Sequence, residues 1–208
     1  MDKPTIVSAA EWQAERDELL RAEKEATRAL DALAARRRRL PMVEFTNAYV
    51  FDTPSGPKSL LDLFDGHGQL AVYQFMDNGP DDYCPGCTWF TDNIPTSAVA
   101  TLAKRDVAWT NVSNMPLAQI KAYKARMGWT LPFVSSRGTS FAADCGAQAF
   151  MLSLFLRDGK RVYRTYSTTS RGVDRLVFVN NIQDLAPYGR QEDWEDSPPG
   201  WPQHPTYG

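Results

Sequence analysis

The 208-residue sequence lacks the long apolar runs and the strong charge of one sign that typify membrane and nucleic-acid-binding proteins. No window approaches the ~18 apolar residues that a bilayer-spanning helix requires. The formal net charge is only −2, which gives no electrostatic reason to expect a nucleic-acid partner. The first twenty residues also lack the apolar run of a secretory signal. We therefore expect a cytoplasmic protein without membrane or nucleic-acid partners.

Cysteine and histidine are scarce. Three cysteines cannot all pair within one chain, so this is not a protein built on a disulfide framework. The two histidines, His67 and His204, are too scattered to complete a nucleophile–base triad. Hydrophobic residues make up 43% of the chain, which is enough for a core of ordinary size.

The N-terminal region predicts one long helix. Residues 9–39 contain neither glycine nor proline and are rich in Ala, Glu, Arg and Leu. Ser8 and Glu11 match a capping box, so the helix should begin at Ala9 and extend on the order of 45 Å. Four arginines at 36–39 suit the negative C-terminal end of its dipole better than an anion site. An apolar stripe should pack on another surface, in part that of a partner subunit; it consists of Trp12, Leu19, Ala22, Ala26, Leu30 and Leu33.

Beyond Pro41 the pattern alternates between strands and helices. This alternation predicts a mostly parallel sheet, to which a late hairpin adds antiparallel strands. We expect a helical extension over 1–41, an α/β domain over 42–186, and a Pro-, Trp- and acid-rich tail over 187–208. The expected elements are strands at 42–51, 69–76 and 106–113, turns at 52–59 and 65–68, a helical turn at 59–64, helices at 85–104 (interrupted at Pro95), 116–128 and 172–184, and a hairpin at 150–167.

The stretch DDYCPGCTWF, residues 81–90, places two cysteines at the start of a helix that follows a buried strand. Unpaired N–H groups and the helix dipole favour an anion there, so the pKa of Cys84 should fall. Pro85 suits the first helical turn because it has no N–H to leave unpaired. Cys87 lies one turn on, close enough to attack a mixed disulfide at Cys84. The pair therefore predicts thiol–disulfide exchange.

Two other interpretations of this pair stay open. A Cys-x-x-Cys motif is also half of a zinc or iron–sulfur site, whose further ligands would come from Cys145, His67 or His204. The two cysteines could also be inert core residues. Cys145 lies between small residues and is expected to be buried, with a distal resolving role as the alternative.

Seven segments spread over residues 7–194 resemble the thioredoxin-like family labelled "domain of unknown function 899", whose members are described as predicted dithiol–disulfide oxidoreductases. The resemblance implies a thioredoxin-like fold, a central mixed sheet flanked by helices, preceded by a long N-terminal helical extension. It also implies that Cys84 is the nucleophile and Cys87 the resolving cysteine. The segments are VSAAEWQAERDELLRAEKEATR, RRRRLPMVEF, SLLDLFDGHGQLAVYQFM, CPGC, MGWTLPFVSS, LFLRDGKRVYRTYSTTSRG and PYGRQEDW.

The sequence departs from related patterns in three places. The segment expected to face the cysteines, QAFMLSLF, lacks the proline that thioredoxins place there, and Pro132 comes too early. Gln74 stands where thioredoxins have a buried acid, and it cannot act as a base, so water or Asp77 would take that role. PDDYCPGC fits the Pro-x-x-x-Thr-x-x-Cys frame of peroxiredoxins, but Cys84 replaces the threonine.

Together these features predict an enzyme that acts on a disulfide-containing protein or small-molecule thiol substrate, with an external reductant and without a bound cofactor or metal. Tyr83, Pro85 and Trp89 are candidates for substrate binding, although the aromatic side chains fit an ordinary core equally well. A thiol peroxidase and a non-catalytic metal-binding or interaction protein on the same scaffold are the alternatives. The long helix suggests a homodimer.

Overall fold

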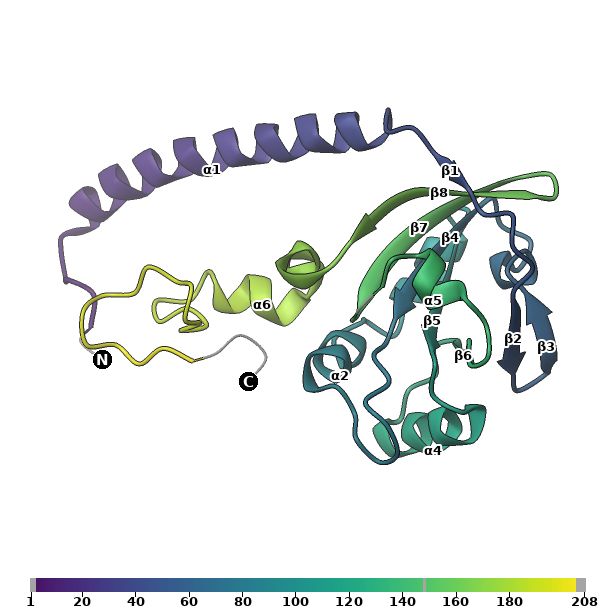
Figure 1. Ribbon diagram of the computed structural model, residues 1–208. Coiled ribbons are helices and arrows are strands. Elements are labelled where there is room, and N and C mark those ends of the chain that lie inside the picture. The colour runs from purple at the N-terminus through teal and green to yellow at the C-terminus, as the bar shows by residue number, and fades with distance from the viewer. Residues whose placement is uncertain (1–2, 148, 205–208) are drawn as a thin grey trace.

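The computed structural model describes residues 3–147 and 149–204. At its centre is one eight-stranded mixed sheet in the order β1-β8-β7-β4-β5-β6-β2-β3 (Figure 1). Strand β4 is parallel to β5 and antiparallel to β7, and β7 and β8 form a hairpin. The strands are β1 (Val43–Glu44), β2 (Val50–Thr53), β3 (Gly56–Ser59), β4 (Gln69–Gln74), β5 (Val107–Ser113), β6 (Phe133–Ser135), β7 (Met151–Asp158) and β8 (Arg161–Thr168).

Helices lie between most of these strands. The predicted interruption at Pro95 is confirmed, because a break separates α2 from α3. Gly128 ends α4 in the left-handed conformation, with φ of 70°. The helices are α1 (Ala9–Arg37), η1 (Asp62–Phe64), α2 (Pro85–Asp92), α3 (Ala98–Ala103), α4 (Leu117–Met127), α5 (Phe141–Asp144), η2 (Ser170–Leu176) and α6 (Phe178–Gln183).

The connections confirm the expected fold class. Strands β5, β4, β7 and β8 lie side by side in that order. Along the chain, β4 is followed by α2 and α3, then by β5 and α4, and finally by the β7–β8 hairpin and the C-terminal helices, with β6 and α5 inserted between α4 and β7. This is the sheet order and connectivity of a thioredoxin-like fold. The parallel pair is joined through helices, and the antiparallel pair through a tight turn, as strand geometry requires.

The prediction of a mostly parallel sheet is wrong: among the described strands, five of the seven pairs are antiparallel, and only β4–β5 and β5–β6 are parallel. Hairpins and added outer strands account for the antiparallel pairs, because such pairs need no crossover helix.

Three local predictions are also wrong. The single strand expected at 42–51 is two strands, β1 and β2, which lie near opposite edges of the sheet because the chain crosses between them. The turn expected at 52–59 contains β3, which pairs with β2 in a short hairpin. The helix expected at 172–184 is divided at Val177, which has an extended backbone, into η2 and α6.

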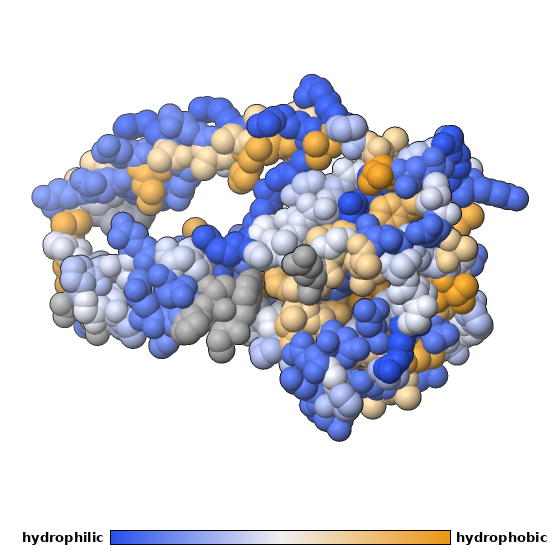
Figure 2. Space-filling view, viewed as in Figure 1, coloured by the Kyte–Doolittle hydropathy of each residue, from blue (hydrophilic) through white to orange (hydrophobic). Residues whose placement is uncertain are grey.

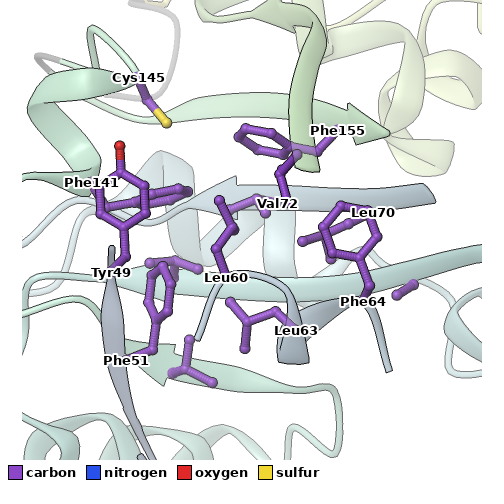
Figure 3. Close-up of a cluster of buried hydrophobic side chains, with 14 residues drawn as sticks. Tyr49, Phe51, Leu60, Leu63, Phe64, Leu70, Val72, Phe141, Cys145 and Phe155 are labelled. Carbon is purple, nitrogen blue, oxygen red and sulfur yellow. The ribbon is translucent and has the colours of Figure 1, made fainter. Parts of the chain in front are cut away.

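Side chains of β4 alternate between two cores on opposite faces of the sheet. Leu70 and Val72 belong to the first core, which η1 and α5 cover. Figure 3 shows this core, where the ring of Phe141 meets Tyr49 edge-on at 5.1 Å. Tyr73 and Phe75 belong to the second core. This second core contains Cys84 and Cys87 together with residues of α2 and α4.

Helix α1 confirms the predicted long N-terminal helix. Ser8 caps it through a reciprocal capping box with Glu11. None of its residues, all of which the structure describes, is buried, so the predicted apolar stripe finds no partner surface within the chain. In Figure 1 the helix projects from the sheet and lies above the C-terminal part of the chain. Its many charges set it apart from a bilayer-spanning helix, and no other helix in the described residues combines the necessary length and apolarity.

Both edges of the sheet are short. β1 has two residues, and β3 has four, among them Pro57 and Lys58. Proline removes a backbone donor, so the outer strands offer few free ladder positions.

Candidate functional site

Cys84 and Cys87 are placed by the junction between β4 and α2. Cys84 is the N-cap of α2 and Pro85 is its first residue. The backbone N–H of Cys87 donates to the Cys84 sulfur at 3.2 Å. The cap is further held because the Thr88 hydroxyl donates to the Cys84 carbonyl oxygen at 2.9 Å. The Cys84 sulfur thus occupies the anion-favouring position that the sequence predicts.

The environment of Cys84 favours its thiolate. The pKa of the Cys84 thiol is lowered to about 6, chiefly because the Cys87 thiol donates a hydrogen bond to the Cys84 sulfur. Backbone N–H groups of Cys87 and Gly86 also lower this pKa, whereas burial and the nearby charge of Asp82 raise it. Cys84 is 8% exposed and Cys87 is fully buried, so Cys84 is the sulfur nearer to solvent. A thiolate with solvent access is the reactive form of cysteine.

Cys87 has the opposite character. Its pKa is raised, first by the hydrogen bond with Cys84 and next by burial. Two groups oppose this change: the backbone N–H of Met76, which lies 3.5 Å from the Cys87 sulfur, and the hydroxyl of Tyr73. The pair therefore combines one acidic thiol with one that holds its proton. Such a division of roles suits a nucleophile and a resolving thiol.

The prediction that Gln74 takes the buried-acid position beneath the cysteines is wrong. Successive side chains of a strand point to opposite faces, and Tyr73, not Gln74, shares the core with the cysteines. Gln74 instead lines a small hollow on the other face with Val112 and Ala142, where its side-chain oxygen has no hydrogen-bond partner. Asp77 is exposed and accepts the Gly79 N–H at 3.0 Å. Two-residue alternation from Leu70 could have identified Tyr73 from the sequence.

The three predicted substrate-binding residues are not gathered equally around Cys84. Pro85 is exposed in the first turn of α2, directly beside Cys84. Tyr83 is half-buried and stacks on Tyr123 with ring centroids 3.6 Å apart. Trp89 lies one turn further along α2, and its indole N–H donates to Asn180 Oδ1 of α6. Trp89 thus connects α2 with the C-terminal part of the chain.

A side-chain network on α4 supports the cysteine turn, and the sequence did not indicate it. Thr88 Oγ1 lies 2.6 Å from the Tyr123 hydroxyl. Since Thr88 uses its own proton toward Cys84, Tyr123 is the donor in that contact. The Arg126 guanidinium lies over the rings of both Tyr83 and Tyr123, at 4.8 and 4.6 Å. The cation therefore stands beside the aromatic pair next to Cys84.

The other candidate metal ligands lie elsewhere. Cys145 is buried in the first core, on the opposite face of the sheet, where desolvation raises its pKa to about 12 (Figure 3). His67 belongs to the turn before β4, near Asp106, and His204 pairs with the backbone of the C-terminal part. Among residues 3–147 and 149–204, no three His, Cys, Asp or Glu side chains converge as metal ligands would.

The segment expected to face the cysteines enters β7. Gln148, its first residue, lies outside the described residues. Phe150 is half-buried against the core that contains the cysteines, and Pro132 lies ahead of β6, on the far side of β5 from β4. The peptide bonds that the structure describes are all trans.

Comparisons with solved structures return proteins of low sequence identity. A thiol:disulfide interchange protein from Bacteroides sp. is 14% identical with a TM-score of 0.47, covering 75% of this chain and 96% of that one. Peroxidoxin BcpB from Mycobacterium tuberculosis is 16% identical with a TM-score of 0.45, covering 64% and 85%. A secreted disulfide oxidoreductase from M. tuberculosis, homologous to E. coli DsbE, is 14% identical with a TM-score of 0.39, covering 62% and 91%.

Comparison with curated proteins finds no match. A family model described as "Bacterial protein of unknown function (DUF899)" matches residues 1–207. Because this match spans nearly the whole chain, it confirms the resemblance seen in the seven sequence segments: the chain belongs to the DUF899 family.

Proposed function

We propose that the protein is a dithiol–disulfide oxidoreductase that acts through Cys84 and Cys87. The observation that carries this proposal is the unequal pair at the start of α2, in which the less buried thiol has a pKa of about 6 and is hydrogen-bonded to a fully buried thiol of raised pKa. A pair of inert core cysteines would not be expected to have pKa values shifted in opposite directions. Perturbed pKa values concentrate at functional sites.

The reaction has two steps. The Cys84 thiolate attacks one sulfur of a substrate disulfide, forms a mixed disulfide and releases the other substrate sulfur as a thiolate. Cys87 then loses its proton and attacks the Cys84 sulfur, which releases the second substrate thiolate and leaves a Cys84–Cys87 disulfide. The substrate gains two electrons, and the protein loses two. An external dithiol reductant restores the two thiols.

The surroundings of Cys84 suggest how a substrate is held. Pro85 and Tyr83 flank the sulfur, and Tyr83 is fixed by stacking on Tyr123. Arg126 adds a positive charge beside this aromatic pair. We propose that Tyr83 and Pro85 contact the substrate next to its disulfide, and that Trp89 acts at the margin of this surface. In the cytoplasm, the protein would serve as a reductant.

A redox titration of metal-free protein tests the proposal, with thiol alkylation read by mass spectrometry. We expect Cys84 and Cys87 to oxidise together as one two-electron couple between about −270 and −180 mV, the range of thioredoxin to protein disulfide isomerase. The reduced protein should also catalyse the reduction of a model disulfide. Thiols that never pair, or that alkylate only after metal is stripped, would contradict the proposal. Faster turnover of peroxide than of disulfides would instead favour the peroxidase.

A further inference from the structure

Helix α1 presents an apolar seam without a partner. Four residues separated by seven positions lie on one side of it, Trp12, Leu19, Ala26 and Leu33, and Leu30 lies on the same side. A seven-residue repeat keeps one stripe of a helix facing another helix along its whole length. The large members of this seam are 40–57% exposed, which is unusual for residues in such a regular pattern.

The rest of the chain leaves room beside this seam. Figure 2 shows an open gap between α1 and the C-terminal segment, residues 170–204, with hydrophobic side chains of α1 along its edge. At the C-terminal end of α1, Arg37 lies over the Tyr166 ring, 5.3 Å from its centroid. The C-terminal segment has exposed apolar residues of its own, namely Leu176, Phe178, Ile182 and Leu185.

The charges of α1 indicate what fills the gap. Residues 9–25 contain six acidic and three basic side chains, a net charge of −3. Residues 26–39 contain five arginines and one aspartate, a net charge of +4. Two copies of this helix therefore repel each other when parallel and attract each other when antiparallel. Antiparallel pairing also places each helix dipole against the opposite end of the other.

We propose that α1 is a dimerisation helix, which pairs antiparallel with α1 of a second copy, seam against seam, inside the gap. A twofold axis near the helix midpoint brings each acidic half beside the basic half of its partner, as an isologous interface requires. The ion pair between Arg16 and Glu23 of the same helix, 2.9 Å apart, lies on the same side as the seam and neutralises the Glu23 carboxylate, which lies near the twofold axis beside its copy. The apolar side chains of the C-terminal segment form the other wall of the interface.

Sedimentation of the full-length protein tests the pairing. We expect twice the chain mass of 23.4 kDa, and we expect Leu30→Glu and Leu33→Glu each to raise the dimer dissociation constant by about tenfold or more. Ala32→Glu is the matched control, because it adds the same charge on the opposite side of the helix and should leave the dimer intact. All three positions are exposed in the single chain, so the circular dichroism spectrum of each variant should match that of the parent protein. A monomeric parent protein, or a dimer unaffected by both leucine variants, would overturn the proposal.

Cross-linking tests the antiparallel orientation. Residue 26 lies near the helix midpoint, whereas residue 34 lies near one end, so two copies of residue 34 would be roughly 33 Å apart along the axis. A short bismaleimide should therefore join two chains of Ala26→Cys, but not two chains of Ala34→Cys, with the parent protein as the background control. Efficient linkage of both variants would indicate parallel helices and overturn the proposal.

Discussion

The backbone N–H of Cys87 points at the sulfur of Cys84 across 3.2 Å, so each cysteine shapes the acidity of the other. One residue supplies two donors to the same sulfur, its main-chain N–H and its thiol. This arrangement stabilises negative charge on Cys84 while keeping the proton on Cys87.

The first prediction concerns pH. Iodoacetamide alkylation of Cys84 in the reduced protein should rise through a midpoint near pH 6 and level off above it, because the thiolate is the reacting form. Cys87→Ala keeps the N–H donor but removes the thiol donor, the largest cause of the lowered pKa. Its midpoint should therefore move to higher pH. Equal midpoints in the two proteins would mean that the Cys87 thiol does not donate to Cys84.

The second prediction separates the three cysteines. Cys84→Ser should abolish disulfide reduction, and Cys87→Ser should accumulate a mixed disulfide that mass spectrometry detects as a mass increase of one substrate thiol less two hydrogens. Cys145→Ser is the matched control and should keep the parent's turnover, because Cys145 lies in the first core. Unchanged turnover by Cys84→Ser would show that Cys84 is not the nucleophile.

The third prediction assigns the Tyr73 hydroxyl to the resolving step. Tyr73→Phe keeps the ring that stacks on Phe90 but removes the hydrogen bond that favours the Cys87 thiolate. Loss of one hydrogen bond, about 0.5–1.5 kcal/mol, should slow resolution by roughly two- to tenfold and shift its pH profile upward. Stopped-flow measurement of mixed-disulfide decay would show this.

Gln74→Leu is the matched control for Tyr73→Phe, since it changes the next side chain of the same strand on the opposite face. It removes a buried oxygen without a hydrogen-bond partner, so it should leave the redox rates unchanged. If mixed-disulfide decay were slower in Gln74→Leu but not in Tyr73→Phe, then Gln74 rather than Tyr73 would assist Cys87 in the resolving step.

The fourth prediction concerns stability. Phe141 is fully buried, and its ring contacts those of Tyr49 and Phe51 edge-on. Phe141→Ala should lower the free energy of unfolding by roughly 3–5 kcal/mol in urea titrations, because it leaves a cavity in the first core. Val50→Ala, at an exposed position of β2, should change it by about 0.5 kcal/mol or less. Similar losses for both would mean that Phe141 is not part of a close-packed core.

Local chemistry explains which parts of the fold were predictable. The capping box at Ser8, the hairpin around Gly159 and the start of α2 at Cys84 each depend on residues adjacent in sequence. β3 was missed because its residues Gly56–Ser59 are typical of a turn, although they pair with β2 in a tight hairpin. β6 was missed because it has only three residues and gains its hydrogen bonds from β5 and β2, which lie much earlier in the chain. No local pattern of three or four residues predicts such long-range pairing.

The candidate site also has features that the sequence predicts and features that depend on tertiary packing. The lowered pKa of Cys84 could be inferred from four residues, CPGC, because its largest cause, the Cys87 thiol, and the smaller contribution of the backbone N–H groups both come from this motif. The contact between Thr88 and Tyr123 joins positions 35 apart, so it depends on how α4 packs against α2. Tyr73 is an intermediate case, because strand alternation would have revealed it once Leu70 had been assigned to a core.

The outer strand β3 limits how this protein can associate. Strand addition needs a row of free N–H and C=O groups, and the proline in β3 interrupts that row at one edge of the sheet. Growth of the sheet by recruiting a strand from another chain is therefore disfavoured at this edge. Partners that bind there must recognise side chains rather than backbone, so self-association through β3 can stop at a defined number of copies instead of continuing into fibres.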